Sequence, residues 1–570
     1  MIIDSRYLQA EQIETDVCII GAGPAGISIA SEFIDQNIEV SLIESGGFEF
    51  DASTQELSAG KTFGDSLLQP IDVNRRQFGG NSNIWIIKIK QQQLGLRYVP
   101  FDEIDFKKRD WIPNSGWPFE RADLKPYYER AQAVCQAGAF DYKPEYWAND
   151  QHQQFPLDTD ILETGVFQFG SADVFHTQYR QKLQTAENIK VYTYANAIEI
   201  LANQSIKVVD KIRLACLGGK QFSVSAKVFI LASGGFENAR LLLMSNQQQP
   251  DGIGNQNDVV GRYYHDHPQA VGNYFVPKDR NLLNKSAFYD LREVKGTPVQ
   301  GFLRLSQQVL EQKRLLNSNT MLFPRPNVRQ TKAMNSFKQL GGTWLDIISK
   351  SASKKKLLDN LPSNLLNIFM GMDYITQALY LAKTQQQSLL PNLGSGGWSK
   401  LADNRGRFER FELMHLIEQS PHPDNRVKLL KDRDALGCQK LGIDWRWRED
   451  DAKSFGRSLE IIGEELAKND MGKLQINLNE QGLPKIVRPT GSHHLMGTTR
   501  MHNNPKQGVV DSDCKVHGMK NLFITGSSTF PTGGYANPTL TIVAMSLRLA
   551  DFVGNMFKGL SYSCLLSIRL

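Results

Sequence analysis

The sequence lacks the cysteine patterns that mark zinc sites and disulfide-rich proteins. Its 570 residues hold only six cysteines, and none stands in a CxxC pair or at the spacing of zinc ligands. Cys18 lies in an apolar segment and is typical of a small core residue. We therefore predict no metal site, and this cysteine usage fits a reducing compartment.

Long apolar runs are also missing. No stretch of 18 or more apolar residues occurs, so we expect no transmembrane helix. Residues 1–15 are acidic and polar and contain no apolar core of signal-peptide length. These two absences, with the cysteine usage, predict a cytoplasmic protein.

The sequence also lacks a strong excess of either positive or negative charge. The chain has 65 Lys and Arg against 60 Asp and Glu, and they are spread along its length. Nucleic-acid binders gather basic residues in a patch or stripe, so we expect no nucleic-acid partner. The short run Lys354-Lys355-Lys356 is typical of a solvated surface. A length of 570 residues predicts two or more domains.

Three separated segments have the pattern of a buried strand, a turn and a helix. The first has strands at 16–20 and 39–43 around a helix at 24–35, which is a βαβ unit. The second has a strand at 227–232 and a helix reaching 241, with a further strand candidate within 190–200. The third has a strand at 521–525 and a helix at 538–553. The strand at 16–20 is typical of a buried parallel strand, and we predict one sheet assembled from these distant segments.

Residues 330–400 look irregular, because Gly341, Gly342, Pro362, Gly371 and a glycine-rich stretch at 394–397 interrupt them. Residues 365–381 are apolar but contain polar breaks. We favour a helical surface segment or lid here. The alternative interpretation is a helix that makes a peripheral membrane or partner contact.

A dinucleotide-binding pattern follows the first strand directly. Gly21-Ala22-Gly23-Pro24-Ala25-Gly26 is a GxGxxG turn between a strand and a helix, where glycines permit the turn, the approach of a pyrophosphate and close helix packing. The helix N-terminus favours the negative charge of a diphosphate. Glu44, at the end of the second strand, is placed to accept hydrogen bonds from a ribose. This pattern alone does not separate FAD from NAD.

The C-terminal block carries a specific resemblance. The residues from Ser492 through Met501 read SHHLMGTTRM; GVVD follows at 508–511, VHGMKNLF at 516–523, GSSTFP at 526–531 and ANPTLTI at 536–542. In order and spacing, the block resembles the C-terminal signature of the glucose-methanol-choline (GMC) oxidoreductases. RQFGGNSNIW at 76–85, GWP at 116–118, ASGGFENAR at 232–240, DHP at 266–268 and PHPDNRV at 421–427 are similar to other segments of that family. The details look closest to its bacterial sugar dehydrogenase and pyranose oxidase branch.

The resemblance implies an α/β fold with a Rossmann-like FAD-binding domain assembled from discontinuous segments, and a second α+β substrate domain on an antiparallel sheet. We expect the FAD-binding domain at 1–95, 191–265 and 485–557. The substrate domain would take 96–190 and 266–484, with the lid-like region at 330–400, and 558–570 would form a tail. Strand candidates at 410–417 and 441–447 fit the substrate-domain sheet. Trp85 and Trp445 have faces suited to a sugar ring, although core packing is the more common use of such residues.

The family resemblance implies an FAD-dependent enzyme that oxidises an alcohol, with a sugar or glycoside hydroxyl as the favoured substrate. The hydroxyl proton goes to a base and the hydride to flavin N5. His494 matches the family's base and Asn537 its second catalytic residue. His493 is the competing base; on a strand, two adjacent histidines point to opposite faces, so we expect only one of them at the flavin. We expect His265, His267, His502 and His517 to be structural or surface residues.

The same resemblance assigns the cofactor contacts. We expect them from Gly21, Gly23, Pro24, Ala25, Gly26, Glu44, Gly79, Gly80, Asn81, Ser82, Asn83, Gly526, Ser527, Pro538 and Thr539. Some members of the branch bind FAD covalently through a histidine, and Ile84 stands at the matching position here. We therefore predict non-covalent FAD.

Several alternatives stay open at this point. A protein of this fold with lyase-type, non-oxidative chemistry is one, and a non-catalytic flavin-binding protein is another. Among alcohol-oxidising enzymes, the motifs do not separate an oxidase from a dehydrogenase, so the electron acceptor is a quinone, a protein or O2. The exact substrate and the oligomeric state are open as well.

Overall fold

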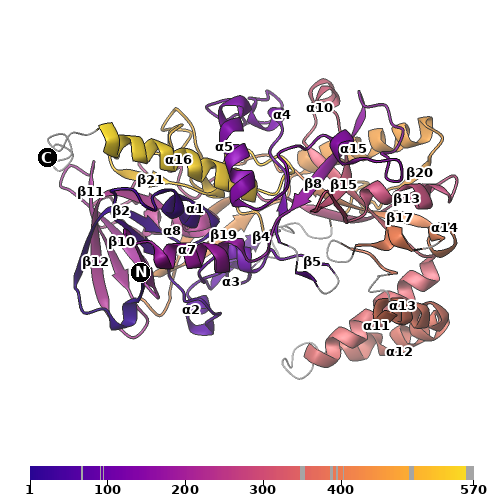
Figure 1. Cartoon of the computed structure of the whole chain (residues 1–570), viewed down its shortest axis with the longest axis horizontal. Helices are drawn as coiled ribbons and strands as arrows, with labels where there is room; N and C mark the ends of the chain where they lie inside the picture. Colours follow the sequence, from indigo (N-terminus) through magenta and orange to yellow (C-terminus); the bar gives the residue numbers. More distant parts are fainter. Residues whose placement is uncertain are drawn as a thin grey trace.

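The computed structural model describes residues 1–65, 69–89, 92–93, 95–346, 354–384, 389–392, 396–401, 403–486 and 493–559. Two large sheets organise the molecule, one toward each end of its long axis (Figure 1). The predicted α/β class is confirmed.

The first sheet joins segments that are far apart in the sequence. In order across the sheet, its strands are β1 (Ile2–Asp4), β9 (Ile189–Thr193), β3 (Val40–Ile43), β2 (Gln12–Ile20), β12 (Gln221–Leu231), β11 (Val209–Ala215) and β10 (Asn196–Ala202), and β21 (Leu522–Ile524) also pairs with β12. The pairs from β1 to β12 and the pair with β21 are parallel, and the pairs among β12, β11 and β10 are antiparallel. Strands β2, β12 and β21 come from the three predicted segments, which confirms one sheet built from all of them.

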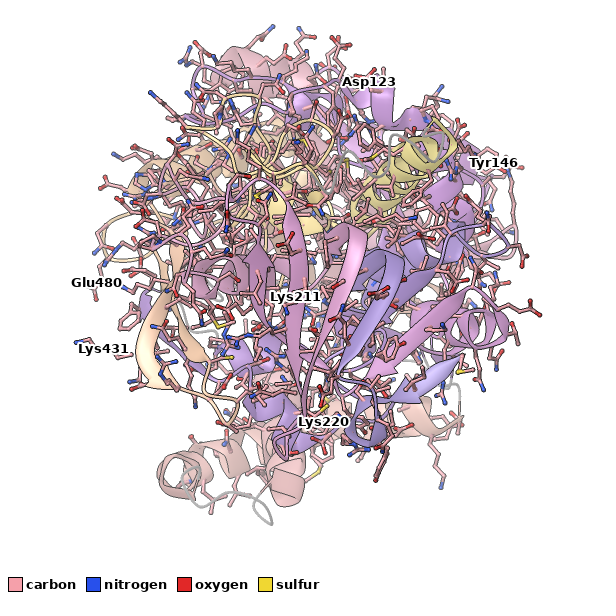
Figure 2. The ribbon with its side chains drawn as sticks, turned by 90° about the vertical axis from the view of Figure 1, so that its left-hand side faces the viewer. Asp123, Tyr146, Lys211, Lys220, Lys431 and Glu480 are labelled. Carbon is pink, nitrogen blue, oxygen red and sulfur yellow. The ribbon has the colours of Figure 1, made fainter. Side chains whose placement is uncertain are left out.

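Helices cover this sheet because its central strands are apolar on both faces. They are α1 (Pro24–Glu32), α5 (Arg121–Val134), α7 (Tyr179–Thr185), α8 (Gly234–Met244) and α16 (Thr539–Gly559). Helix α16 packs on α5 and α1. Figure 2 views this end, with α16 above the strands and Lys220 at the β11–β12 turn. Within the described part of the chain, α16 is also the one helix long and apolar enough to cross a membrane, but 67% of its apolar window is buried in the protein.

The second sheet is antiparallel throughout. Its order is β20 (Gly472–Gln475), β13 (Gln269–Pro277), β17 (Arg410–Ile417), β16 (Ser318–Arg325), β15 (Thr297–Leu305), β8 (Leu162–Phe169) and β7 (Arg97–Tyr98), with β14 (Arg292–Val294) beside β15. Its side chains alternate between two cores, as period-two strands require. One face packs on the core of the first sheet, and we call it the roof face; its apolar members are Phe167, Phe169, Phe302, Met321, Phe323, Met414 and Leu416.

A smaller sheet corrects one strand prediction. The strand expected at 441–447 is β19 (Gln439–Trp445), and it pairs with β18 (Arg426–Arg433) and β4 (Gly60–Gly64) rather than with the substrate-domain sheet. The interpretation of Trp445 as a core residue is confirmed, because its side chain is fully buried in an apolar cluster. A short hairpin, β5 (Lys88–Ile89) and β6 (Gln92–Gln93), stands apart.

The stretch predicted to be irregular is largely helical. It holds α11 (Val328–Asp346), α12 (Lys354–Met370) and α13 (Met372–Thr384), which we call the helical module. Figure 1 shows the module projecting from the body, near the second sheet. The remaining helices are α2 (Ala52–Glu56), α3 (Pro70–Val73), α4 (Glu103–Phe106), α6 (Pro144–Trp147), α9 (Leu282–Lys285), α10 (Gln307–Lys313), α14 (Asn404–Arg407) and α15 (Glu449–Lys468).

The domain boundaries stay a prediction. Two helices depart from them in their packing, since α5 and α7 fall within 96–190 but pack on α16 and on α1 and β9 respectively. Most of the predicted tail, residues 560–570, lies outside the described residues. Cys18, Cys135, Cys216, Cys438 and Cys514 are all free thiols, whereas Cys564 lies in that tail.

Candidate active site

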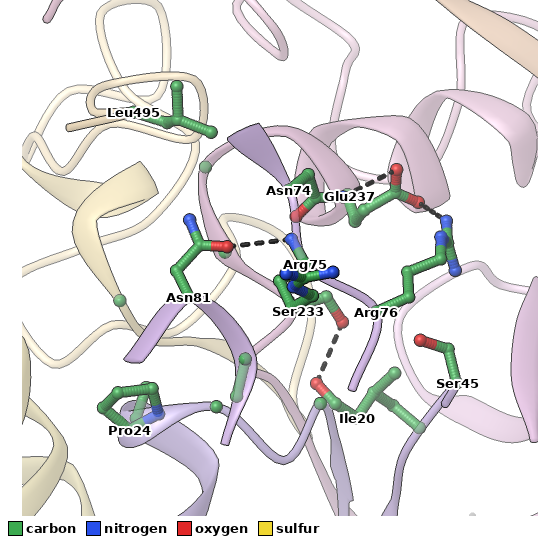
Figure 3. Close-up of a pocket in the computed structure, with 18 of the residues that line it drawn as sticks. Ile20, Pro24, Ser45, Asn74, Arg75, Arg76, Asn81, Ser233, Glu237 and Leu495 are labelled. Carbon is green, nitrogen blue, oxygen red and sulfur yellow. Dashed lines mark hydrogen bonds and ion pairs between the residues drawn. The ribbon is translucent and has the colours of Figure 1, made fainter. Parts of the chain in front are cut away.

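One cavity is lined both by the glycine-rich turn after β2 and by His493 and His494. Figure 3 shows part of its lining, with Pro24, Asn81 and Leu495 among the labelled residues. The empty space in the cavity, with its open mouth included, is about 1100 Å³. Ten of the predicted cofactor residues line it: Gly21, Gly23, Pro24, Ala25, Glu44, Gly80, Asn81, Gly526, Ser527 and Pro538. Gly26, Gly79, Ser82, Asn83 and Thr539 are not among its lining residues. A single elongated cavity therefore joins the dinucleotide motif to the predicted base.

The glycines of the turn have the geometry that the motif predicts. Gly21 has φ +109°, and a Cβ there would lie 2.6 Å from the Ala232 carbonyl oxygen. At Gly26 a Cβ would lie 1.9 Å from the Gly21 carbonyl oxygen, so only glycine lets α1 pack this closely. The nearest atom to a Cβ at Gly23 is the Gly80 Cα at 3.9 Å, which leaves that position open. The turn therefore keeps space for a ligand beside the N-terminus of α1.

Glu44 directly follows β3, and backbone N–H groups donate hydrogen bonds to its carboxylate. Its Oε2 accepts from the Ala22 N–H at 2.9 Å and its Oε1 from the Gly46 N–H at 2.8 Å. Burial raises the pKa of this carboxyl group. Each carboxylate oxygen can accept more than one hydrogen bond, so the group can still bind a ribose hydroxyl.

A buried charge network on the cavity wall was missed from the sequence. The Arg76 guanidinium lies 2.7 Å from the Glu237 carboxylate, and Arg240 joins Glu237 to Asp434. Asn74 donates to Glu237, and Asn81 accepts from the Arg75 N–H (Figure 3). Arg76, Glu237 and Arg240 all lie in segments that resemble the family, but the sequence did not indicate that they form a charge network.

The two adjacent histidines do not lie on a strand, and that part of the prediction is wrong. Residues 493–495 have no regular secondary structure, and His493 has φ +57°. Both His493 and His494 line the cavity. The strand argument that only one of them meets the cofactor therefore fails, because alternation of faces requires extended backbone.

A chain of hydrogen bonds runs through His494. The Arg97 Nε–H donates to Asn537 Oδ1 at 2.8 Å, and Asn537 Nδ2 lies 3.1 Å from His494 Nε2. His494 Nδ1 lies 2.8 Å from His267 Nδ1, and His267 Nε2 lies 3.2 Å from the Gly533 carbonyl oxygen. Arg97 comes from β7, Asn537 and Gly533 from the loop before α16, His494 from the segment after residue 492, and His267 from the segment before β13.

The two ends of this chain fix its direction. An arginine only donates and a carbonyl oxygen only accepts. The Gly533 carbonyl thus places the His267 proton on Nε2 and leaves Nδ1 to accept from His494 Nδ1–H. Neutral His494 then carries a lone pair on Nε2, which faces the Asn537 amide. Burial, then the charges of His267 and Arg97, hold the pKa of His494 well below its usual value, so it is neutral at neutral pH.

Asp266 holds the two histidines together. Its Oδ1 accepts from the backbone N–H of His267 at 2.6 Å and of His494 at 3.0 Å. Within the described ranges its Oδ2 has no hydrogen-bond partner. Burial raises the pKa of Asp266 to about 7 and lowers that of His267 to about 3. His267, expected to be structural or at the surface, is buried and lies in direct contact with His494.

Arg97 is a further residue of this site that the sequence did not reveal. It is buried on the roof face, its guanidinium lies over the Phe167 ring, and Nη1 contacts the Met321 sulfur. Among the residues that the structure describes, no carboxylate lies within ion-pair distance of it. Burial lowers its pKa to about 9. The one available signal was a single charged residue in an otherwise apolar stretch at 96–101.

Further polar side chains share the roof face. Strand register puts Gln300 beside Phe167 and Asn319 beside Leu416, on the same side as Met321. Both side chains are buried. In the described part of the molecule, Asn319 Nδ2, Asn319 Oδ1 and Gln300 Oε1 have no hydrogen-bond partner. Trp85 lines the cavity, and its indole N–H also lacks a partner among the described residues. Orphaned buried polar atoms point to ligands, because such groups are costly when unpaired.

Comparison with known proteins assigns the family. The GMC oxidoreductase model matches residues 421–546. The paromamine 6'-oxidase of Streptomyces fradiae is 32% identical, over 94% of this chain and 91% of the relative. The chain belongs to the GMC oxidoreductase family.

Two further comparisons agree along nearly the whole chain. The 2-methyl-1,2-propanediol dehydrogenase of Mycolicibacterium austroafricanum is 22% identical over 96% of both chains. A crystal structure of formate oxidase superposes with a TM-score of 0.52 and 15% identity, covering 97% of this chain and all of that one. The second likeness shows the fold alone.

The assignment confirms the predicted fold class and an FAD-dependent oxidoreductase of this GMC family. The cavity fits FAD on its own evidence. It has an open glycine turn at a helix N-terminus, a carboxylate at the ribose position and positive-φ glycines, Gly234 and Gly526, at which a Cβ would meet nothing within 4 Å.

Proposed function

We propose that this GMC oxidoreductase oxidises a hydroxyl-bearing carbon of a sugar or glycoside, with His494 as the proton acceptor. The oriented chain from Arg97 to Gly533 carries the proposal, because it leaves one unprotonated imidazole nitrogen facing an amide donor at the cavity end. One relative is named for oxidation of paromamine and another for dehydrogenation of a propanediol, and both names support a hydroxyl-bearing substrate.

The chain would hold FAD non-covalently along the cavity. The N-terminus of α1 and the turn at 21–26 would face the diphosphate, and Glu44 would bind the adenosine ribose. Gly80, Asn81 and Pro538 would border the flavin. FAD bound in this way supplies the two-electron acceptor, with hydride from the substrate carbon arriving at flavin N5.

The proton follows a path set by the protein. A substrate hydroxyl at the cavity end would donate its hydrogen to His494 Nε2 and accept a hydrogen bond from Asn537 Nδ2. Loss of the hydroxyl proton to Nε2 leaves negative charge developing on the substrate oxygen, and the Asn537 N–H stabilises that charge. His267 keeps His494 in the required tautomer by accepting from Nδ1–H.

Arg97 acts through Asn537 in this scheme as a positioning residue. Its Nε–H fixes the amide with the oxygen away from His494, so that Nδ2 is the atom presented to Nε2 and the substrate. Its positive charge also polarises that N–H and favours neutral His494. The cost of burying an unpaired guanidinium is the kind of local penalty that marks functional sites.

The roof face supports a substrate with several hydroxyl groups. Asn319 and Gln300 offer amide atoms that have no partner within the described residues, and Trp85 adds an aromatic ring at the cavity wall. A polyhydroxylated ring would use these groups, whereas a plain alkanol would leave them unpaired.

Anaerobic titration tests the proposal directly. Sugars, glycosides and simple alcohols are added in turn to the purified yellow protein, and loss of the flavin absorption is recorded. We expect bleaching by hydroxylated rings. Admitting air or adding a quinone afterwards separates O2 from a quinone or a protein as the acceptor, by the speed at which the colour returns. A flavin spectrum that no alcohol changes would instead support lyase-type chemistry or a non-catalytic flavoprotein.

A separate measurement tests how the cofactor is held. Because Ile84 cannot form a bond to the flavin, acid precipitation should release the yellow colour into the supernatant. Colour retained in the pellet would contradict non-covalent binding.

A further inference from the structure

The helical module has an unusual distribution of apolar side chains. Of the large apolar residues that are exposed in the described structure, eight lie in it: Val328, Leu365, Leu366, Phe369, Met370, Met372, Leu379 and Tyr380. Elsewhere such residues are scattered singly, which is normal for a protein surface. Phe369 is 76% exposed and Tyr380 64%. These eight residues, which we call the apolar patch, are the densest exposed apolar group on the described chain.

Helix α12 exposes more large apolar side chains than an ordinary surface helix does. Leu365, Leu366, Phe369 and Met370 recur at helical spacing on its exposed side. The residues that turn inward are mixed: Asn364 is buried, Asn367 donates to the Ser336 hydroxyl of α11, and Ile368 packs partly buried against the apolar core beneath the module. On α13, Met372, Leu379 and Tyr380 continue the exposed side, while Tyr374, Ile375 and Ala378 pack inward. Burial of this exposed apolar face of α12 and α13 against a binding partner would therefore be favourable.

Lys and Arg are spread along the chain, but their excess over Asp and Glu falls in the same segment. Residues 328–384 contain eight Lys and Arg against three Asp, which is a net charge of +5. The whole protein also has a net charge of +5, so everything outside this segment is balanced. Lys354, Lys355 and Lys356 open α12, the helix that carries Leu365 to Met370, and Lys383 closes α13 near Tyr380.

We propose that the apolar patch and its flanking lysines dock the enzyme on an anionic lipid membrane. Helices that combine exposed Leu, Phe and Met with lysines bind in the plane of the interface through apolar burial and attraction to anionic headgroups. A second copy of this chain is a poorer occupant, because it would bring two segments of like charge together. The module lies on the membrane rather than crossing it, since α16 is the one spanning candidate in the described residues.

The position of the module links this contact to the active site. It is inserted between β16 and β17, which are paired from Arg325–Arg410 to Ser318–Ile417. On the roof face, β16 carries Asn319 and Met321, and β17 carries Met414 and Leu416. Docking would therefore place the roof sheet next to the lipid surface. The proposal itself rests on surface residues and does not depend on the substrate proposed above.

Vesicle co-sedimentation of the full-length, FAD-loaded protein tests the proposal. The probes are phosphatidylcholine vesicles with and without phosphatidylglycerol, at about 0.15 M salt. We expect binding to the anionic vesicles at least about tenfold stronger than to the neutral ones, and weaker binding as salt rises. Equal or absent binding to both vesicle types would overturn the proposal.

Two variants separate the contributions. Leu366→Ser with Phe369→Ser removes apolar area and should weaken binding by about a hundredfold. Lys354→Gln with Lys355→Gln and Lys356→Gln should weaken it by about a hundredfold as well, at roughly fivefold per lysine. The matched control, Phe63→Ser with Leu478→Ser, removes two exposed apolar residues outside the module and should change binding less than twofold. Equal loss in the control, or a dimer in solution that the apolar double variant abolishes, would assign the patch to another role.

Discussion

Two buried arginines, Arg97 on β7 and Arg109 after α4, have different surroundings. Arg109, 2% exposed, lies against the fully buried Glu418, with both guanidinium nitrogens donating to its carboxylate at 2.8 and 2.5 Å. Arg97, 7% exposed, donates instead to a neutral amide and contacts a methionine sulfur. Burial lowers both pKa values, but the Glu418 carboxylate raises that of Arg109 above its usual value, whereas that of Arg97 falls to about 9.

The difference separates a charge that is neutralised within the fold from one that lies unpaired beside the proposed catalytic residues. Arg109 and Glu418 satisfy each other and tie the segment after α4 to the end of β17, with Asn317 donating its backbone N–H to the same carboxylate. Arg97 is left without a counter-ion where its charge acts on Asn537 and His494. We therefore expect changes in the first region to cost stability, and changes in the second to cost activity.

The largest effect should come from the site region. His494→Ala removes the proposed proton acceptor and should lower kcat by about a thousandfold. FAD content and thermal stability should stay near those of the natural protein, because the imidazole serves catalysis. Steady-state kinetics and the flavin spectrum measure both.

His493→Ala is the matched control for that variant, since both histidines line the cavity. It should keep at least about a tenth of the activity, because no step needs its imidazole. The reverse result, with His493→Ala inactive and His494→Ala active, would move the base to His493.

The structural region should respond in stability. Glu418→Gln leaves the Arg109 guanidinium buried without its counter-charge, which should lower the free energy of unfolding by about 3–5 kcal/mol. Urea unfolding measures it. Glu311→Gln, at the exposed Lys107–Glu311 pair, is the control and should cost less than about 1 kcal/mol. Similar losses in the two variants would mean that burial does not set the difference between the two regions.

Arg97→Met should show the opposite result, with activity lost and stability kept. The substitution removes an unneutralised buried cation, so stability should change by less than about 1 kcal/mol or increase. The Asn537 amide loses its anchor, and kcat should fall by about ten- to a hundredfold. Arg97→Lys, which keeps the charge but not the Nε–H geometry, should lie between. An Arg97→Met protein with full kcat but reduced stability would place Arg97 in the structural class with Arg109.

The smallest effect concerns pH. His494 must be neutral to accept a proton, so activity is present above its pKa and is lost as pH falls through it. Because that pKa lies below 6.5, kcat/KM should still be at its plateau at pH 6.5. Arg97 is one of the charges that lower it, and Arg97→Met should shift the acid limb upward by up to about one unit. A limb that does not move would remove Arg97 from the electrostatics of His494.

Some of the site could be predicted because it consists of backbone geometry. The turn at Gly21, Gly23 and Gly26 needs the absence of a side chain, and that absence is visible in a sequence. Glu44 follows from the length of a βαβ unit. Strands 410–417 and 521–525 were found to within a residue at each end, because apolar strands bounded by turns leave a local pattern.

The rest depended on contacts between distant segments. His267 meets His494 across 227 positions in the sequence, and Arg97 meets Asn537 across 440. Nothing local to Arg97 indicates that its neighbour will be an amide rather than a carboxylate. The same limit explains β19, whose pattern predicted a strand but not which sheet it would join, since pairing partners are chosen by tertiary packing.

The sequence by itself determined the family and the cofactor motif, because each is written in contiguous residues, and from the same residues it predicted His494 and Asn537 as the catalytic pair. Only the tertiary structure decided the tautomer of His494, the partner of each buried arginine and the outward direction of the apolar face on α12. Those properties belong to pairs of groups brought together by folding, and their energies depend on burial and on the second member of each pair.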